Sequence, residues 1–209
     1  MTWNINCVPQ EKQKYSQWSG GTTTELALYP HNSSYAQRDF LWRISTATVD
    51  METSTFTNLP AYNRIIMPLR GSKLQLYHEE HHNKSLALLE TDAFHGSWIT
   101  TSVGKVQDFN LMYTDACEGS MYGYLLKEEL SLNYEPDQKA GKGTHIFIAF
   151  YFLGGTVELE VPELDYQMNV PDKLFFSLTG EVHDKSLTVK LKPVEQSMPV
   201  TVAIVKIIY

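Results

Sequence analysis

The feature that most constrains the fold is the near absence of helical periodicity along this chain. Short β-branched and aromatic runs recur instead, many with alternating polarity, and Gly, Pro, Asn and Asp residues separate them. This pattern is typical of a β-sandwich or a β-barrel. The predicted strands are residues 22–29, 40–49, 64–69, 73–78, 86–89, 109–113, 146–153, 156–161, 174–178, 186–191 and 200–208. Residues 122–132 are ambiguous, because their Leu-Leu-Lys-Glu-Glu-Leu centre could form one helical turn.

Length and composition limit the classes of protein to consider. A chain of 209 residues suits one large β domain or two small ones, and its hydrophobic fraction of 43% is enough for a packed core. The formal net charge is −7 and the Lys and Arg residues are scattered, which argues against a nucleic-acid partner.

Cellular location is predicted from three negative observations. No segment approaches the roughly 18 apolar residues of a membrane-spanning helix, and the first residues lack the basic and apolar regions of a signal peptide. Cys7 and Cys117 are far apart and have no metal or redox spacing, so we expect two reduced thiols. We therefore expect a cytoplasmic protein that does not contact membranes.

A weak internal repeat suggests a duplicated β unit. Placing Gly71 on Gly154 aligns Leu76 with Leu159 and preserves the phase of the strands. Each glycine could form a two-residue hairpin, since glycine tolerates the positive φ of tight turns. We expect an N-terminal barrel over residues 1–133, a polar junction over 135–143 and a C-terminal barrel over 144–209, which could count together as one compact domain.

Four segments in the first half of the chain are specific when taken together. They are residues 18–26 (WSGGTTTEL), 38–49 (RDFLWRISTATV), 56–64 (FTNLPAYNR, followed by LRG at 69–71) and 104–112 (GKVQDFNLM). Their order and spacing resemble those of the HutD/Ves family. Ser19-Gly20 departs from the commoner form, in which many members carry an Asn before a longer glycine run.

The resemblance implies an all-β bicupin with little helix, in which two cupin-like barrels pack in one chain and the N-terminal barrel holds a pocket. It also implies a small-molecule binder rather than an established enzyme. One branch of the family is linked to histidine catabolism, with urocanate or formylated glutamate as suggested ligands. Another branch is known as stress-induced.

Strand alternation places candidate binding groups on one face of residues 40–49. Arg43 and Ser45 point to one side together with small residues, whereas Trp42 and Ile44 form the opposite, apolar face. A guanidinium on an inward face can hold a carboxylate by two parallel hydrogen bonds. The alternative is that Arg43 is solvated or pairs with a structural acid.

Further polar residues come from the other matched segments. Asp108 and Asn110 share a strand face and could bind a polar ligand or partner an arginine, unless they only form an Asx turn. Glu25, beside the glycine pair, could line the mouth of a pocket. The candidate ligand-binding residues are Glu25, Arg43, Ser45, Arg64, Asp108 and Asn110.

The sequence does not predict a metal site or another cofactor. Metal-dependent cupins carry two alternating histidines on a strand, a Glu shortly after and a third histidine later, and no His-x-His occurs here. The polar run 77–84 is expected to be an exposed loop in which any metal binding is adventitious. His95, His145 and His183 are not spaced as partners.

Three hypotheses for function follow. The leading one is a cytoplasmic binder of a small carboxylate-bearing metabolite with a regulatory or metabolite-buffering role. The second is a metal-independent isomerase or lyase acting on a small organic acid, with Asp108 or Glu25 as the base. The third is a β-barrel scaffold for protein contacts. An apolar sheet face could also support a homodimer.

Overall fold

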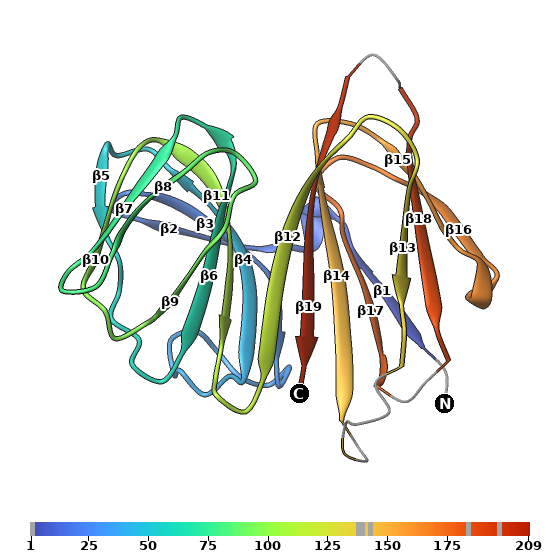
Figure 1. The fold of residues 1–209 in the computed structure, drawn as a ribbon, viewed down its shortest axis with the longest axis horizontal. Coiled ribbons are helices and arrows are strands. Elements are labelled where there is room, and N and C mark those ends of the chain that lie inside the picture. Colours follow the sequence, from blue (N-terminus) through green and yellow to red (C-terminus); the bar gives the residue numbers. More distant parts are fainter. Residues whose placement is uncertain (1–2, 137–140, 142–143, 183–184, 196–197) are drawn as a thin grey trace. The chain divides into compact units, whose positions relative to one another are not determined.

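The computed structural model describes residues 3–136, 141, 144–182, 185–195 and 198–209. These residues form two compact units (Figure 1), here called the N-terminal barrel (residues 13–122) and the C-terminal barrel (residues 3–12 with the described part of 123–209). The described helices are two short 3-10 turns, η1 (Gln10–Lys12) and η2 (Pro162–Leu164). No helix in the described ranges has the length and hydropathy needed to cross a membrane.

The N-terminal barrel consists of a six-stranded and a four-stranded antiparallel sheet. The larger sheet has the order β2 (Lys14–Trp18), β3 (Gly21–Tyr29), β4 (Trp42–Val49), β11 (Val106–Tyr113), β6 (Asn63–Gly71), β9 (Asp92–His95). The smaller sheet has the order β5 (Thr53–Thr55), β10 (Thr100–Val103), β7 (Leu74–His78), β8 (Asn83–Leu86). Its core joins Ile66 and Phe94 of the larger sheet to Leu76 and Leu86 of the smaller one. The β-rich sequence pattern is thus satisfied by burying one face of each sheet against the other.

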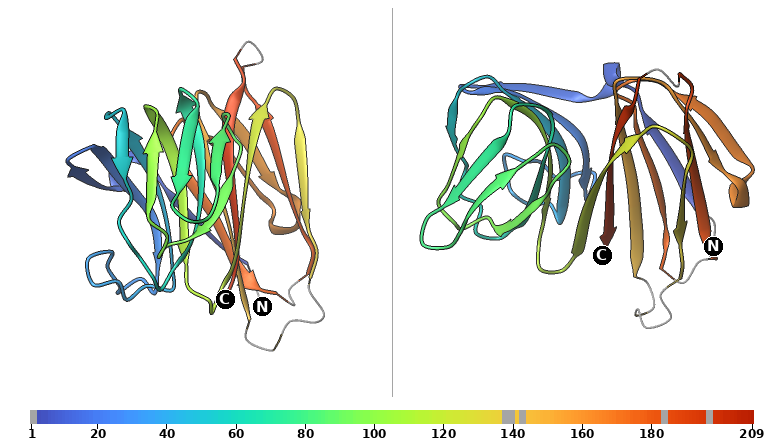
Figure 2. Two further views of the ribbon diagram at one scale, coloured as in Figure 1. Left: turned by 60° about the vertical axis from the view of Figure 1, so that its left-hand side comes forward. Right: turned by 45° about the horizontal axis from the view of Figure 1, so that its top comes forward.

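The C-terminal barrel is also built from two sheets (Figures 1 and 2). Its five-stranded sheet has the order β1 (Asn4–Val8), β17 (Phe175–Glu181), β14 (His145–Leu153), β19 (Val200–Ile208), β12 (Glu118–Leu126). Its four-stranded sheet has the order β13 (Leu130–Tyr134), β18 (Leu187–Pro193), β15 (Val157–Val161), β16 (Tyr166–Val170). Large apolar side chains such as Phe150, Phe152 and Phe176 are fully buried in its core.

The two barrels repeat one strand order. Adding eight to each strand number converts β5-β10-β7-β8 into β13-β18-β15-β16, and β4-β11-β6-β9 into β12-β19-β14-β17. The aligned glycines occupy equivalent turns, with φ of 103° at Gly71 and 99° at Gly154. The predicted hairpins are nevertheless wrong, because β6 and β7 lie in different sheets, as do β14 and β15. Each glycine turn carries the chain from one sheet to the other.

The strands divide between the barrels differently from the predicted boundaries at 133 and 144. Three strands, β1, β12 and β13, belong to sheets of the C-terminal barrel, although all or most of their residues lie in the predicted N-terminal range 1–133. Partner choice depends on residues far away in the chain, which a boundary drawn from local composition does not capture. Of the predicted junction, residues 137–140 and 142–143 lie outside the described residues.

The predicted strands differ from the observed ones mainly where the chain is polar. The helical turn suggested within 122–132 is wrong, since this segment contributes to β12 and β13. The strand predicted at 86–89 is instead Asn83–Leu86. The sequence pattern also misses β1, β2, β5, β9, β10 and β16, which are three to five residues long.

Candidate functional site

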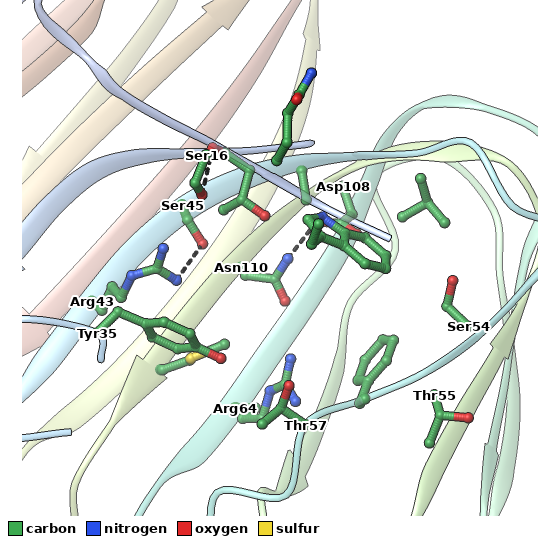
Figure 3. Close-up of a pocket in the computed structure, with 17 residues that line it drawn as sticks. Ser16, Tyr35, Arg43, Ser45, Ser54, Thr55, Thr57, Arg64, Asp108 and Asn110 are labelled. Carbon is green, nitrogen blue, oxygen red and sulfur yellow. Dashed lines mark hydrogen bonds between the residues drawn. The ribbon is translucent and has the colours of Figure 1, made fainter. Parts of the chain in front are cut away.

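A cavity of about 360 Å³ lies within the N-terminal barrel (Figure 3). Its floor is the inward face of the larger sheet, and β5 with the residues after it closes another side. The lining residues are Ser16, Gln17, Trp18, Thr23, Tyr35, Arg43, Ser45, Ala47, Val49, Ser54, Thr55, Phe56, Thr57, Arg64, Asp108, Asn110 and Met112.

Strand pairing arranges the polar floor residues in rows across the sheet. Met112 of β11 lies opposite Arg43 of β4 on one side and opposite Arg64 of β6 on the other. Two residues along β11, Asn110 lies opposite Ser45. Since side chains alternate between faces, positions two apart on each strand point into the same cavity. This is why segments far apart in the sequence supply one site.

Arg43 is buried but its guanidinium is partly neutralised. Its Nε donates to Glu25 Oε2 at 2.8 Å, and its Nη1 donates to Ser45 Oγ at 3.1 Å. The ring of Tyr35 lies 4.5 Å from the guanidinium carbon. Lys14 Nζ lies 3.6 Å from the other oxygen of Glu25. The acid therefore fixes the orientation of Arg43, as the structural-pair alternative proposed, while Arg43 still faces the cavity.

Arg64 has no salt-bridge partner of this kind, although the Asp108 carboxylate attracts it when ionised. It is 7% exposed, and the rings of Phe56 and Phe94 lie 4.7 and 5.2 Å from its guanidinium carbon. Its buried Nε has no hydrogen-bond partner among the described residues. Burial lowers the pKa of Arg64 to about 10, so the group stays cationic at neutral pH. A cation held mainly by ring faces retains its capacity to bind an anion.

Asp108 and Asn110 lie within β11 rather than in an Asx turn. Asn110 Nδ2 donates a hydrogen bond to Asp108 Oδ1 (Figure 3). Burial raises the pKa of Asp108 to about 7, although the charge of Arg64 acts in the opposite direction. The carboxyl group thus changes between donor and acceptor near neutral pH.

Several buried polar atoms of the lining residues have no protein partner. Ser54 Oγ, Arg64 Nε and Asn110 Oδ1 are each buried without a hydrogen bond to any described residue. Leaving a buried donor or acceptor unpaired costs about 1–3 kcal/mol. Such atoms call for a physical explanation, and a polar ligand or water in the cavity provides one.

The structure brings five of the six candidate residues into the cavity lining. Glu25 does not line the cavity and acts on it through Arg43. Sequence reasoning missed Tyr35 and Ser54 because they lie in a polar loop and in the three-residue strand β5. Phe56 was recognised only as a motif residue, because its contact with Arg64 depends on the fold of the loop between them.

The cavity does not fit a metal ion. Its lining contains two guanidinium groups and no histidine, cysteine or glutamate, so Asp108 is the single carboxylate ligand it offers. Metal sites need three or four convergent donor groups. The donor set suits an anion.

The expectation of an exposed loop at 77–84 is wrong for His78, which is 2% exposed. His78 Nε2 lies 3.0 Å from Asp92 Oδ2, and His82 Nε2 lies 3.2 Å from the same oxygen. Burial lowers the pKa of His78. Burial alone would raise the pKa of Asp92, but hydrogen bonds from both histidines and the charge of Lys84 outweigh it and lower that pKa. His183 lies outside the described residues.

The family model of HutD matches residues 10–193. The chain belongs to the HutD family. No curated protein sequence matches it. The conserved protein of unknown function PA5104 from Pseudomonas aeruginosa PAO1 is similar in structure, with a TM-score of 0.77 and 19% identity over 98% of both chains.

Two further solved structures have a similar fold. HutD from Pseudomonas fluorescens SBW25 has a TM-score of 0.67 and 16% identity, over 97% of this chain and 98% of that one. Oxalate decarboxylase OxdC from Bacillus subtilis has a TM-score of 0.61 and 7% identity, over 98% of this chain and 77% of that one. These likenesses are to folds and confirm the predicted all-β bicupin.

Proposed function

We propose that this HutD-family protein binds a small carboxylate-bearing metabolite in the cavity of its N-terminal barrel. The observation that carries the proposal is Arg64, a buried cation with an unpaired Nε that faces the same cavity as the unpaired Asn110 Oδ1. Burying a charge without a hydrogen-bonded partner costs several kcal/mol. Asp108 attracts Arg64 only when it is ionised, and its pKa of about 7 leaves it partly protonated at neutral pH, so an anionic ligand is the partner that fits the guanidinium.

The lining suggests how such a ligand would be held. A carboxylate can accept two hydrogen bonds from the Arg64 guanidinium, while Asn110 Oδ1 accepts one from a ligand N–H or O–H group. Arg43, fixed by Glu25, supplies a second positive charge. The volume of about 360 Å³ lies at the small end of the range of roughly 300–1,000 Å³ for ligand pockets, which favours a compact metabolite.

The biological role proposed is regulatory or metabolite-buffering, in the cytoplasm. HutD from Pseudomonas fluorescens was solved in a formate condition, and formate is therefore the simplest acid to test on this chain. A link to histidine catabolism or to stress makes urocanate and formylglutamate the next ligands to test. Two earlier expectations stay predictions. One is that the protein has no nucleic-acid or membrane partner, and the other is that it can form a homodimer.

Calorimetry and thermal unfolding with formate, urocanate and formylglutamate test the proposal, with formamide as an uncharged control. A ligand at 100 times its dissociation constant should stabilise the protein by about 2.7 kcal/mol. Arg64→Met should weaken binding at least about tenfold, since hydrogen bonds to charged groups contribute about 1.5–3 kcal/mol. Arg70→Met is the matched control, because Arg70 is exposed on the same strand β6.

Glu25→Gln separates positioning from direct contact. It removes the charge that orients Arg43 but no group that lines the cavity, so we expect a smaller loss of affinity than in Arg64→Met. The proposal is refuted if no acid raises the melting temperature, or if Arg64→Met and Arg70→Met bind the same acid equally well.

A second candidate function is favoured by Asp108, whose pKa of about 7 suits a general base or acid. In that case a bound acid would be isomerised or cleaved without a metal. Turnover of a binding acid that is lost in Asp108→Asn, with binding retained, would establish an enzyme. Binding without turnover at any pH between 5 and 9 would leave the protein a binder.

A further inference from the structure

We propose that His78, His82 and Asp92 form a binding site for a divalent transition-metal ion of the Zn²⁺, Co²⁺ and Ni²⁺ class. The three residues come from the end of β7, the turn that follows it and the start of β9. One donor atom from each lies within 4.8 Å of the other two. None of the three lines the cavity, so the site is separate from the acid site proposed above.

The donor spacing approaches that of a tetrahedral site. Zinc bonds to histidine nitrogen and carboxylate oxygen are about 2.0–2.2 Å long, so neighbouring tetrahedral ligands lie roughly 3.3 Å apart. His78 Nε2 and His82 Nε2 lie 3.0 and 3.2 Å from Asp92 Oδ2. An ion can therefore enter with shifts of a few tenths of an ångström along these two edges. The third edge, between the two histidine donor atoms, is at most 4.8 Å long and would have to shorten by up to about 1.5 Å. Two imidazoles and one carboxylate leave the fourth position to water.

The hydrogen-bond partner of the His78 Nδ1 atom fits metal ligation through Nε2. A histidine that binds a metal through Nε2 carries its proton on Nδ1 and usually donates it to a neighbouring acceptor. Here Nδ1 lies 2.8 Å from Thr100 Oγ1, and this hydroxyl lies 3.3 Å from the carbonyl oxygen of Trp98. With the proton on Nδ1, His78 donates to Thr100 and Thr100 donates to Trp98. With the proton on Nε2, the Thr100 hydroxyl must instead donate to His78 Nδ1, and its hydrogen bond to the carbonyl oxygen of Trp98 is lost.

The surroundings make one side of the site rigid and leave the other open. The ring of Phe94 lies 4.6 Å from that of His78, which is completely buried at its side chain. His82 has a side-chain exposure of 40%, so an ion can enter from its side. Lys84 Nζ lies 3.3 Å from Asp92 Oδ1, the oxygen that the ion does not need. The Lys84 charge therefore opposes cation binding without blocking the ligands.

Trp98 provides a built-in reporter. Its ring lies 5.5 Å from that of His78 and 5.6 Å from that of His82. Co²⁺ and Ni²⁺ quench tryptophan fluorescence at such short range. We expect saturable quenching at one equivalent of Co²⁺ per chain of tag-free protein, with the intense visible absorption of four-coordinate Co²⁺. Trp98→Phe should abolish the quenching but keep the absorption.

Variants identify the ligands. His82→Asn should lower the affinity for Co²⁺ and Zn²⁺ by about tenfold or more, because even the loss of a group that hydrogen-bonds to a metal ligand costs about that much. His81→Asn is the matched control, because His81 stacks on Trp98 at 3.8 Å but is not one of the three donors. Lys84→Gln should raise the affinity roughly twofold to fivefold, the size of an exposed charge interaction. Circular dichroism and the melting temperature in EDTA check that each variant is folded.

The proposal is overturned by any of three results. These are the absence of saturable Co²⁺ binding at millimolar concentration, binding that His81→Asn weakens and His82→Asn does not, and unchanged or weaker binding in Lys84→Gln. A purely structural histidine–aspartate pair would give the first result. Adventitious binding by surface histidines would give the second.

Discussion

Replacing Asp108 by Asn should stabilise the ligand-free protein, and by an amount that depends on pH. The side chain keeps its size, and its oxygen can still accept the hydrogen bond from Asn110 Nδ2. Burial raises the pKa of Asp108 from its usual 3.8 to about 7 in the folded protein. The folded state therefore holds this proton more tightly than the unfolded state. As the pH rises from 3.8 to 7, the unfolded chain releases the proton first, and wild-type stability falls.

The size of the effect follows from the two pKa values. Each pKa unit corresponds to 1.36 kcal/mol, and the interval from 3.8 to about 7 gives a cost of about 4 kcal/mol for the ionised carboxylate at pH 8. The same linkage relation gives less than about 1 kcal/mol at pH 4 and about 2 kcal/mol at pH 5. Asp108→Asn should gain these amounts relative to the wild-type protein.

Urea unfolding at pH 4, 5, 6, 7 and 8, followed by tryptophan fluorescence, measures this difference. Trp18, Trp42 and Trp98 lie in the N-terminal barrel, so the signal reports mainly on that unit. Asp50→Asn is the control, because Asp50 is exposed and its replacement should change stability little at any pH. A stability difference for Asp108→Asn that is constant across this range, or that shrinks as the pH rises, would refute the account of a buried acid whose pKa rises on folding.

Three other substitutions test separate parts of the structure. Arg64→Met should stabilise the ligand-free protein by up to about 3 kcal/mol, since burial lowers the Arg64 pKa from 12.5 to about 10, and its unfolding at pH 7 should therefore need more urea. Gly21→Ala should destabilise the protein by about 1–3 kcal/mol, because φ is 153° and the added Cβ would lie 1.9 Å from the Thr48 carbonyl oxygen. Gly141→Ala is its control and should be close to neutral in the same unfolding assay, because the nearest atom to its added Cβ is 3.7 Å away. Phe150→Ala should cost about 3–5 kcal/mol, since this fully buried ring packs in the C-terminal core, and a smaller loss would mean that the core closes over the space.

The grouping of polar cavity residues on shared faces of two strands follows from sequence alone. Alternation along residues 42–49 placed Arg43 and Ser45 on one face, and alternation in the 106–113 strand did the same for Asp108 and Asn110. This is local information, since the period of two is a property of any extended backbone. The repeat around Gly71 and Gly154 likewise revealed a duplicated unit, although not the sheets that each turn connects.

Tertiary structure decided which faces meet. The antiparallel pairing of β11 with both β4 and β6 puts Arg43 and Arg64 on either side of Met112, and no local pattern encodes that pairing. It also made Glu25 a positioning acid rather than a lining residue, and it buried His78 against Asp92. Strand alternation is fixed by neighbours in the chain, whereas strand partners, burial and the pKa values that follow from them depend on packing between distant segments. The sequence therefore determined the β class and the polar faces, and only the folded barrel joined those faces into a cavity with a buried arginine whose Nε has no partner among the described residues.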